Sequence, residues 1–291
     1  MINNIAIVGC GDVGLRIAKG LCDVDVNKQT IMPIVRSPES QQKLLAEFSE
    51  TICLDLDINQ ESQTRLSDVS ELYYLVPPQK SGSSDLRSQQ FLKLLATYGT
   101  SLQRIVLIST TGVYGDCQGE HVTEKMPLNP TTPRSQRRAD MEQQWLNFVE
   151  QQQCLLSILR VPGIYSFSRL PRARLEKQAP IVDPAECGFT NRIHADDLAM
   201  VCITVMREQQ ATDIYNATDG HPGKMSEYFI EVAKFLGLPK PQVMSFADAE
   251  SLVTTEMMSY LSESRKISNK KLLTTFNLKL SYPDYREGIR F

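Results

Sequence analysis

Short apolar runs alternate with amphipathic stretches along the first half of the chain. The first run, Ile5 to Val8, leads into Gly9 and then into helical periodicity that reaches Leu21. Further apolar runs predict strands at 29–35, 51–54, 71–76 and 104–109, and residues 85–98 have the spacing of a helix that ends at Gly99. Strands that alternate with helices form parallel sheets with right-handed crossovers, so we expect an α/β fold, a Rossmann-type doubly wound parallel sheet.

The pattern loosens after Tyr165, where residues 166–188 have the composition of long loops with one short helix. Long loops inside a compact enzyme are more often substrate lids than linkers. We therefore expect residues 1–165 to form an NAD(P)-binding Rossmann domain, with later contributions from about 190–220. Residues 166–291 are expected to form a smaller C-terminal α/β substrate-binding region.

The glycines after the first run predict a dinucleotide site. Gly9 permits a tight turn, Gly11 leaves no side chain where a pyrophosphate lies against the backbone, and Gly14 lets the helix approach the strand. The N–H groups at the helix start then face the anion, which adds Asp12 and Val13 to the expected cofactor contacts.

The ends of the following strands supply further candidates for cofactor binding: Arg36, Ser37, Asp55, Val76 and Pro77. Arg36 stands where an acidic residue would accept hydrogen bonds from a free ribose hydroxyl, and a guanidinium suits a 2′-phosphate. We therefore expect NADP, with NAD as the alternative if Arg36 is only a solvated loop residue. Asp55 is placed to contact adenine, and so is its neighbour Asp57. Ser37 also has the position of a helix N-cap, followed by Pro38.

The composition of the chain limits the classes of molecule that we expect it to bind. A net charge of −3 gives no basic field for nucleic acid or an anionic membrane surface. No apolar stretch approaches a membrane span, and the N terminus enters a strand instead of a signal peptide, so we expect a cytoplasmic protein with a small-molecule substrate. Seven cysteines without metal-ligand spacing and three histidines predict no metal site.

Ser109-Thr-Thr-Gly-Val-Tyr-Gly115 resembles the strand end of the extended short-chain dehydrogenase/reductases, the NAD-dependent epimerase/dehydratase family. The resemblance extends over nearly the whole chain, through Leu159-Arg-Val-Pro-Gly-Ile-Tyr165 and Asn191-Arg-Ile-His-Ala-Asp-Asp-Leu198. It implies that Thr110 hydrogen-bonds the reacting oxygen. It also implies a Tyr-x-x-x-Lys pair at the start of the next helix, and there this chain carries Arg134 and Arg138. An arginine cannot act as the missing acid/base, because its pKa lies above about 12.

Two roles remain for these arginines. On a helix, Arg134, Arg137 and Arg138 share one sector with the apolar stripe that contains Met141 and Trp145, so they point inward. Cations at a helix N terminus oppose the macrodipole and need an anion. A bound ligand supplies it in one interpretation; structural ion pairs with residues such as Glu120 or Glu124 supply it in the other.

The resemblance also implies that Asn191 and Arg192 edge the substrate pocket and that Tyr165 lies near the nicotinamide. Tyr114 is expected to be a packing residue. His194 and Asp197 are expected to form the turn and cap of a helix that starts at Leu198.

Two functions stay open. The first is an NADP-dependent oxidoreductase of the epimerase/dehydratase type with a non-standard acid/base and an unidentified small or sugar-nucleotide-type substrate. The second is a non-catalytic NADP-binding sensor or regulatory protein, favoured by the missing Tyr-Lys pair. The resemblance further implies a homodimer formed through the helices at 85–98 and 134–151.

Overall fold

The computed structural model describes residues 3–24, 29–58, 66–98, 101–252 and 260–291. The chain forms two compact units, and each unit collects three separate segments of the sequence. Unit 1 consists of Met1–Val113, Pro133–Arg160 and Leu198–Tyr215, and unit 2 consists of Tyr114–Thr132, Val161–Asp197 and Asn216–Phe291. The units therefore interleave along the chain.

Unit 1 is built on a seven-stranded sheet with the strand order β12-β7-β5-β4-β1-β2-β3. Its strands are β1 (Asn3–Val8), β2 (Gln29–Val35), β3 (Ile52–Cys53), β4 (Glu71–Tyr74), β5 (Arg104–Thr110), β7 (Leu155–Val161) and β12 (Asp213–Asn216). Strand β1 pairs in parallel with β2 and with β4, the central strand, and β4 pairs in parallel with β5. The predicted Rossmann-type sheet is thus confirmed, with the order reversing beside β1 as in dinucleotide-binding folds.

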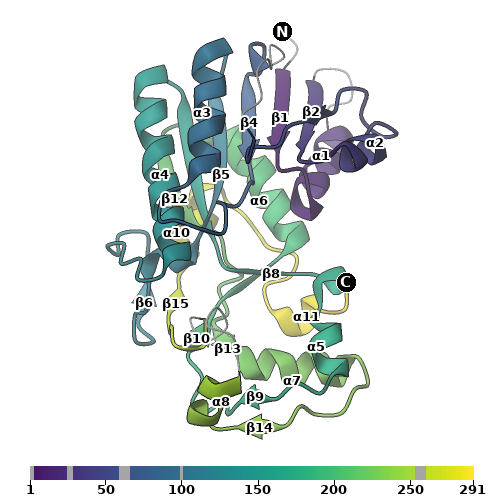
Figure 1. Cartoon of the computed structure of the whole chain (residues 1–291), viewed down its shortest axis with the longest axis vertical. Helices are drawn as coiled ribbons and strands as arrows, with labels where there is room; N and C mark the ends of the chain where they lie inside the picture. Colours follow the sequence, from purple (N-terminus) through teal and green to yellow (C-terminus); the bar gives the residue numbers. More distant parts are fainter. Residues whose placement is uncertain (1–2, 25–28, 59–65, 99–100, 253–259) are drawn as a thin grey trace. The chain divides into compact units, whose positions relative to one another are not determined.

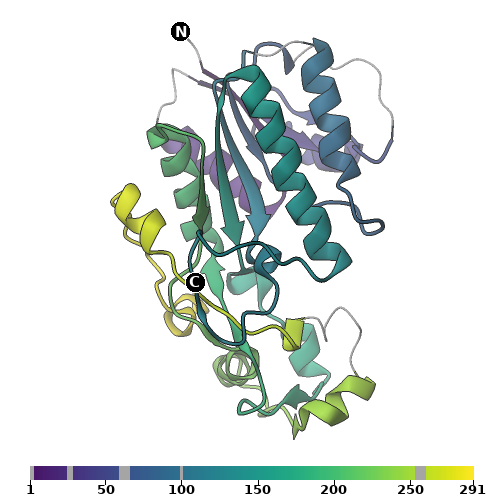
Figure 2. The same ribbon diagram turned by 90° about the vertical axis from the view of Figure 1, so that its left-hand side faces the viewer.

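Helices cover both faces of this sheet (Figures 1 and 2). They are α1 (Asp12–Val24), α2 (Pro38–Leu44), α3 (Leu86–Tyr98), α4 (Pro133–Gln152) and α6 (Ala195–Glu208). Helices α3 and α4 lie on one face, whereas α1 and α6 lie on the other. A methyl group added at Gly20 of α1 would lie 2.8 Å from the side chain of Ile203 in α6, so these two helices are in close contact.

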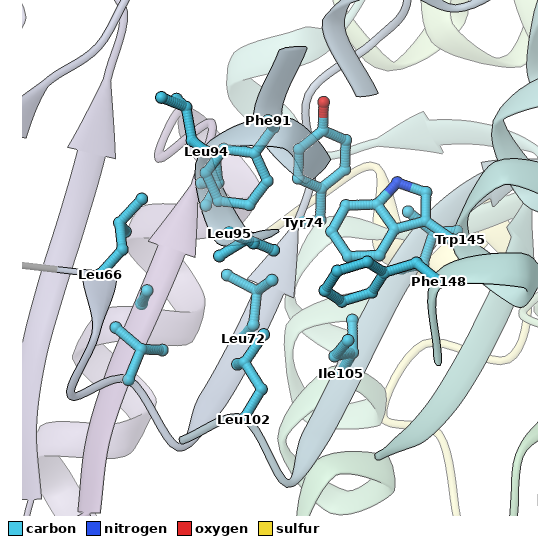
Figure 3. Close-up of a cluster of buried hydrophobic side chains, with 14 of the residues drawn as sticks. Leu66, Leu72, Tyr74, Phe91, Leu94, Leu95, Leu102, Ile105, Trp145 and Phe148 are labelled. Carbon is cyan, nitrogen blue, oxygen red and sulfur yellow. The ribbon is translucent and has the colours of Figure 1, made fainter. Parts of the chain in front are cut away.

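The core beneath α3 and α4 is aromatic (Figure 3). The Tyr74 ring lies 5.4 Å from that of Phe91 and 4.8 Å from that of Trp145, between ring centroids. All three side chains are buried, and the indole N–H of Trp145 donates to the Ser88 hydroxyl at 3.0 Å. This contact joins α4 to the first turn of α3 and fixes the two helices relative to each other.

The helix starts follow the local sequence. Ser37 caps α2, since its hydroxyl accepts from the Ser40 N–H, and Pro38 occupies the first helical position as predicted. Asp85 caps α3 by accepting from the N–H groups of Arg87 and Ser88. The predicted helix at 85–98 is confirmed as α3; Gly99 lies outside the described residues.

Unit 2 is assembled from short strand pairs and helices. Its parallel pairs are β8 (Gly163–Tyr165) with β11 (Arg192–His194), β9 (Ile181–Val182) with β14 (Val243–Met244), and β6 (His121–Val122) with β15 (Lys266–Ile267). Strand β10 (Phe189–Thr190) pairs antiparallel with β13 (Gly223–Lys224). The helices are α5 (Arg172–Glu176), α7 (Met225–Phe235), α8 (Phe246–Leu252), α10 (Lys270–Thr275) and α11 (Tyr285–Gly288). A cluster around Tyr165, Tyr228 and Tyr285 forms one of its cores.

Candidate functional site

The glycine turn after β1 has the geometry that a phosphate-binding turn needs. Gly9 has a φ of +83°, and an added Cβ there would meet Val76 at 3.0 Å. At Gly14 an added Cβ would meet the Ile7 side chain at 3.2 Å, whereas at Gly11 the nearest atom would be 4.0 Å away. Gly9 is therefore required by the backbone itself, whereas a side chain at Gly14 would press against Ile7. Gly11 faces open space instead, which suits a group that lies directly against the main chain.

Helix α1 starts immediately after this turn, at Asp12, followed by Val13 and Gly14. The first N–H groups of a helix have no partner inside the helix and carry its positive end, so they attract an anion. The carboxylate of Asp12 accepts from Arg16 Nε at 3.0 Å, one turn further along. This pair offsets the negative charge that Asp12 brings to the turn.

Four charged side chains gather at the carboxyl ends of β2, β3 and β4. Arg36 Nε lies 3.1 Å from Asp55 Oδ2, and its Nη2 lies 3.0 Å from Asp57 Oδ2. Arg87, from α3, donates to both oxygens of Asp57 at 2.6 Å. These hydrogen bonds lower the pKa of Asp57, with a smaller contribution from the charge of Arg36. The predicted Arg36 and Asp55 are thus side by side, within an ionic network of two arginines and two aspartates.

The loop after β4 closes the same edge of the sheet. Val76 lies against Gly9, and the carbonyl of Pro77 accepts from Arg87 Nη1 at 2.9 Å. Unit 1 therefore brings the glycine turn, Val76, Pro77 and the Arg36 network together at one edge. Ser37 lies next to Arg36, but its hydroxyl is used at the start of α2, where it also donates to the Ser40 hydroxyl.

Thr110 ends β5, the neighbour of β4 in the sheet. Its half-buried hydroxyl oxygen accepts from the Gly112 N–H at 3.2 Å. That bond uses a lone pair of the oxygen and fixes the side chain, while the hydroxyl proton can still be donated to another oxygen. The predicted role of Thr110 requires a hydrogen bond donated in this way, and that role stays a prediction.

Ser109, the residue before Thr110, contacts a buried ion pair. Glu142 of α4 accepts from Arg160 of β7 at 2.7 Å and from the Ser109 hydroxyl at 2.5 Å, and all three residues are at most 3% exposed. The interaction ties α4 to two strands just below the sheet edge. This ion pair was not predicted from the sequence, and its partners are 18 residues apart in the chain.

Two of the arginines at the start of α4, Arg137 and Arg138, point inward, as the helical sector predicted. Arg137 is buried and donates to the Gly82 carbonyl at 2.5 Å, and half-buried Arg138 donates to the Ile108 carbonyl of β5 at 3.1 Å. Burial lowers the pKa of Arg138 to about 10, against the raising effect of Asp85 and Tyr74, so it remains a cation at neutral pH. Arg134 is half-buried in the first turn of the same helix.

In unit 2, the predicted Tyr165 and Arg192 lie on the paired strands β8 and β11. The Arg192 guanidinium lies over the Tyr228 ring at 4.3 Å and the Tyr285 ring at 5.1 Å. Burial lowers its pKa and raises that of Tyr165. Arg192 Nη1 and the Tyr165 and Tyr285 hydroxyls are buried polar atoms without a hydrogen-bond partner among the described residues.

Asn191 has a visible structural task. Its amide donates to the Arg265 carbonyl at 3.0 Å, and its oxygen accepts from the Ile267 N–H at 2.9 Å. The side chain thus connects two segments that are more than 70 residues apart in the sequence. Substrate binding by Asn191 stays a prediction.

The expectation for Asp197 was wrong. Helix α6 begins at Ala195, before Asp197, and the carboxylate accepts from the N–H groups of Ser281 and Tyr282, both at 2.8 Å. Asp197 therefore anchors a distant loop instead of capping its own helix. His194 does bond locally, to the Asp196 N–H, and Tyr114 is the buried packing residue that was predicted.

Neither a metal site nor a membrane segment is found in the described parts of the chain. They contain no group of three or more histidine, cysteine, aspartate or glutamate side chains placed to hold a metal ion. The helices described are also too short or too polar to cross a bilayer. Cys117 lies half-buried in the loop after Tyr114. Burial raises the pKa of its thiol, so this cysteine is not activated as a nucleophile.

The chain is similar to known proteins in sequence and in structure. No family model matches the sequence. The chain is 26% identical to Protein YeeZ of Escherichia coli strain K12 over 97% of both chains. A functionally unknown conserved protein from Silicibacter pomeroyi superposes with a TM-score of 0.81 at 25% identity, over 99% of this chain and 97% of that one.

Two enzyme complexes with NAD have the same fold. The dTDP-glucose 4,6-dehydratase of Bacillus anthracis has a TM-score of 0.75 at 15% identity, over 100% of this chain and 94% of that one. The UDP-glucuronic acid 4-epimerase of Bacillus cereus has a TM-score of 0.76 at 15% identity, over 98% and 96%. The fold is that of the NAD-binding epimerases and dehydratases. In this epimerase/dehydratase fold, the glycine turn and the network around Arg36 share one edge of the parallel sheet.

Proposed function

We propose that the protein binds NADP at the edge of unit 1 and acts as an oxidoreductase of the epimerase/dehydratase type. The observation that carries the proposal is the glycine turn, where Gly11 keeps open space in front of the start of α1. The pyrophosphate would lie against Gly9, Gly11 and the N–H groups of Asp12, Val13 and Gly14.

The preference for NADP rests on Arg36. Its side chain is 64% exposed at the end of β2, where the ribose of a bound dinucleotide is read. A guanidinium there favours a 2′-phosphate, with Ser37 beside it, Asp55 toward the adenine, and Val76 and Pro77 along the cofactor. Calorimetric titration with both dinucleotides tests this assignment. We expect NADP to bind at least tenfold more tightly, and a tenfold preference for NAD would contradict it.

The substrate would be a small molecule or a sugar nucleotide. The named structural neighbours act on dTDP-glucose and UDP-glucuronic acid, which supports that class. A bound nicotinamide dinucleotide supplies reversible hydride transfer to carbon. Within unit 1, Thr110 would hold the reacting oxygen through its free hydroxyl proton, and Arg138 would hold the end of β5 through the Ile108 carbonyl. Asn191, Arg192 and Tyr165 of unit 2 are proposed as further ligand-binding residues.

The proton donor would be unusual, because α4 carries Arg134 and Arg138 where the family's Tyr-Lys pair is expected. Arginine does not exchange protons at neutral pH, so the two side chains would bind and orient instead. Burial raises the pKa of Tyr165, which does not suit a base at neutral pH either. We propose that water or the substrate itself carries the proton.

The absence of an evident proton donor favours a second candidate, an NADP-binding sensor without turnover. The two functions differ in one experiment: the protein is mixed with NADPH and a panel of small carbonyl compounds and sugar nucleotides, and absorbance at the nicotinamide band is followed. For an enzyme, Thr110→Ala is expected to lower the rate by about 100-fold through loss of a transition-state hydrogen bond, whereas Thr110→Ser retains it. Tight NADPH binding without turnover on any compound would favour the sensor.

A further inference from the structure

The charges around Arg36 require explanation if this residue is to bind a phosphate. Its two partners, Asp55 and Asp57, together carry as much negative charge as Arg36 and Arg87 carry positive charge. Two carboxylates beside a dianionic 2′-phosphate would repel it. The network must therefore contain a feature that frees Arg36 from its partners.

Arg87 holds Asp57 more firmly than Arg36 does. Its Nε and Nη2 donate to the two carboxylate oxygens at 2.6 Å each, the parallel geometry that a guanidinium and a carboxylate prefer. Its Nη1 donates to the Pro77 carbonyl, and the side chain is 16% exposed. Arg87 also belongs to the first turn of α3, which Asp85 caps. The position of the guanidinium is thus fixed by its own helix and by the loop after β4.

Arg36 is held more loosely. It makes one contact of 3.1 Å with Asp55 and one of 3.0 Å with Asp57, and its side chain is 64% exposed. Exposed ion pairs of this kind contribute little free energy. Asp57 Oδ2 is shared by both arginines, so Asp57 keeps its two bonds to Arg87 if Arg36 turns away.

The turn that carries the two aspartates is held by its own contacts. The Asp57 N–H donates to Asp55 Oδ1 at 3.0 Å, and Leu56 between them is 9% exposed in the core beneath. These contacts keep both carboxylates close to Arg36. Because Arg87 neutralises Asp57 in place, the 3.1 Å contact with exposed Arg36 that is left to break is the one with Asp55.

We infer that Arg87 determines cofactor specificity: it occupies Asp57 with a two-point hydrogen bond and so leaves Arg36 available for the 2′-phosphate of NADP. This inference rests on the proposed dinucleotide function. Arg87 acts as a positioning residue, because it touches Asp57 and Pro77 and needs no contact with the cofactor. When Arg87 is lost, the Asp57 carboxylate keeps its contact with Arg36 but loses the cation that neutralised it, so it both holds Arg36 and repels the phosphate.

The test measures dissociation constants of NADP and NAD by calorimetry for the full chain and for Arg87→Met. We expect NADP binding to weaken by about tenfold while NAD binding changes by less than twofold, because only NADP carries the 2′-phosphate. The control is Lys43→Met. It removes an exposed cation on α2 that is paired with Glu39 at 2.6 Å, and we expect it to leave both affinities unchanged.

A second substitution separates this role from a merely structural one. Asp57→Asn removes the charge that Arg87 neutralises, so the Arg87→Met/Asp57→Asn double variant is expected to recover NADP binding to within about threefold of the unmodified protein. If Arg87→Met does not fold, Arg87→Lys keeps the cation and loses the two-point geometry, and we expect a smaller selective loss.

Each result has a distinct meaning. An equal loss of NADP and NAD affinity, or no recovery in the double variant, would overturn the role of Arg87. Failure of the unmodified protein to bind either dinucleotide would overturn the proposed function instead.

Discussion

Gly9 and Gly11 are two residues apart, yet substitution at each should have a different consequence. Gly11→Ala places a methyl group 4.0 Å from the nearest atom, so the fold is expected to persist while dinucleotide affinity falls by about tenfold or more. Gly9→Ala has a φ of +83° and a contact of 3.0 Å with Val76, so it should lower the free energy of unfolding by about 1–3 kcal/mol. Urea unfolding together with NADP titration distinguishes the two effects. Equal loss of stability in both variants would contradict the open space at Gly11.

The buried carboxyl of Asp219 is expected to make the free energy of unfolding depend on pH. It is 3% exposed, and burial raises its pKa from 3.8 to about 7, although its carboxylate accepts from the His221 N–H. At a pH between these two pKa values, the Asp219 carboxyl is ionised in the unfolded chain and protonated in the folded protein. Its contribution to stability is therefore complete below pH 4 and decreases as the pH rises toward 7.

The Asp219→Asn variant isolates this effect, because an amide oxygen can still accept from His221. We expect the stability of the unmodified protein, relative to the variant, to fall by about 2 kcal/mol between pH 5 and pH 7. Urea unfolding at pH 5, 6 and 7 measures the difference. A difference that does not change with pH would show that Asp219 is ionised throughout this range.

At the scale of elements, the ion pair between Glu142 and Arg160 holds α4 to β7. Both side chains are at most 4% exposed, so Arg160→Met leaves an unpaired buried carboxylate and should lower the free energy of unfolding by about 3–5 kcal/mol. The double variant Glu142→Leu/Arg160→Met should lose much less, since no charge is left buried. Chemical denaturation checks both. Removal of the exposed Glu39–Lys43 pair serves as the control, with an expected change below about 0.5 kcal/mol.

Elements of unit 1 were predictable because their signals are local. The apolar runs located β2 and β5 to within a residue, and Ser37 and Pro38 marked the start of α2. The pairing of β8 with β11 and of β6 with β15 had no such signal. These strands are two or three residues long and pair with segments far away in the sequence.

The same limit applies to the site. The glycine turn and Arg36 could be located from spacing, because their neighbours along the chain define them. Arg87 could not, since its partner Asp57 is 30 residues away and the contact forms only when α3 packs beside β4. Its position at the start of a helix that follows the Pro77-Pro78 strand end was the available clue. Asp197 was misjudged for the same reason, because its partners are 84 and 85 residues away.

At the scale of the whole molecule, we propose a homodimer formed through α3 and α4. The two helices are neighbours on one face of the sheet, and their exposed positions include Gln89, Lys93, Ala96, Gln143 and Asn147. Analytical ultracentrifugation is expected to give about twice the chain mass. Ala96→Arg on α3 should then shift the protein toward the monomer through steric and charge repulsion at the interface. A monomer at high protein concentration would contradict this arrangement.

Because the two units interleave along the chain, no single continuous fragment contains one complete unit alone. The chain passes from one unit to the other five times, and Leu198–Tyr215 returns to unit 1 long after most of that unit has been made. A fragment that stops at residue 165 would lack α6 and the edge strand β12, so the part of the sheet face that α6 covers and the edge of β7 would be bare. Neither unit can therefore be inherited, exchanged or expressed as an uninterrupted stretch of sequence. Two of the three segments of unit 2 are insertions between segments of unit 1, so evolution can alter them only as insertions within the sequence of unit 1.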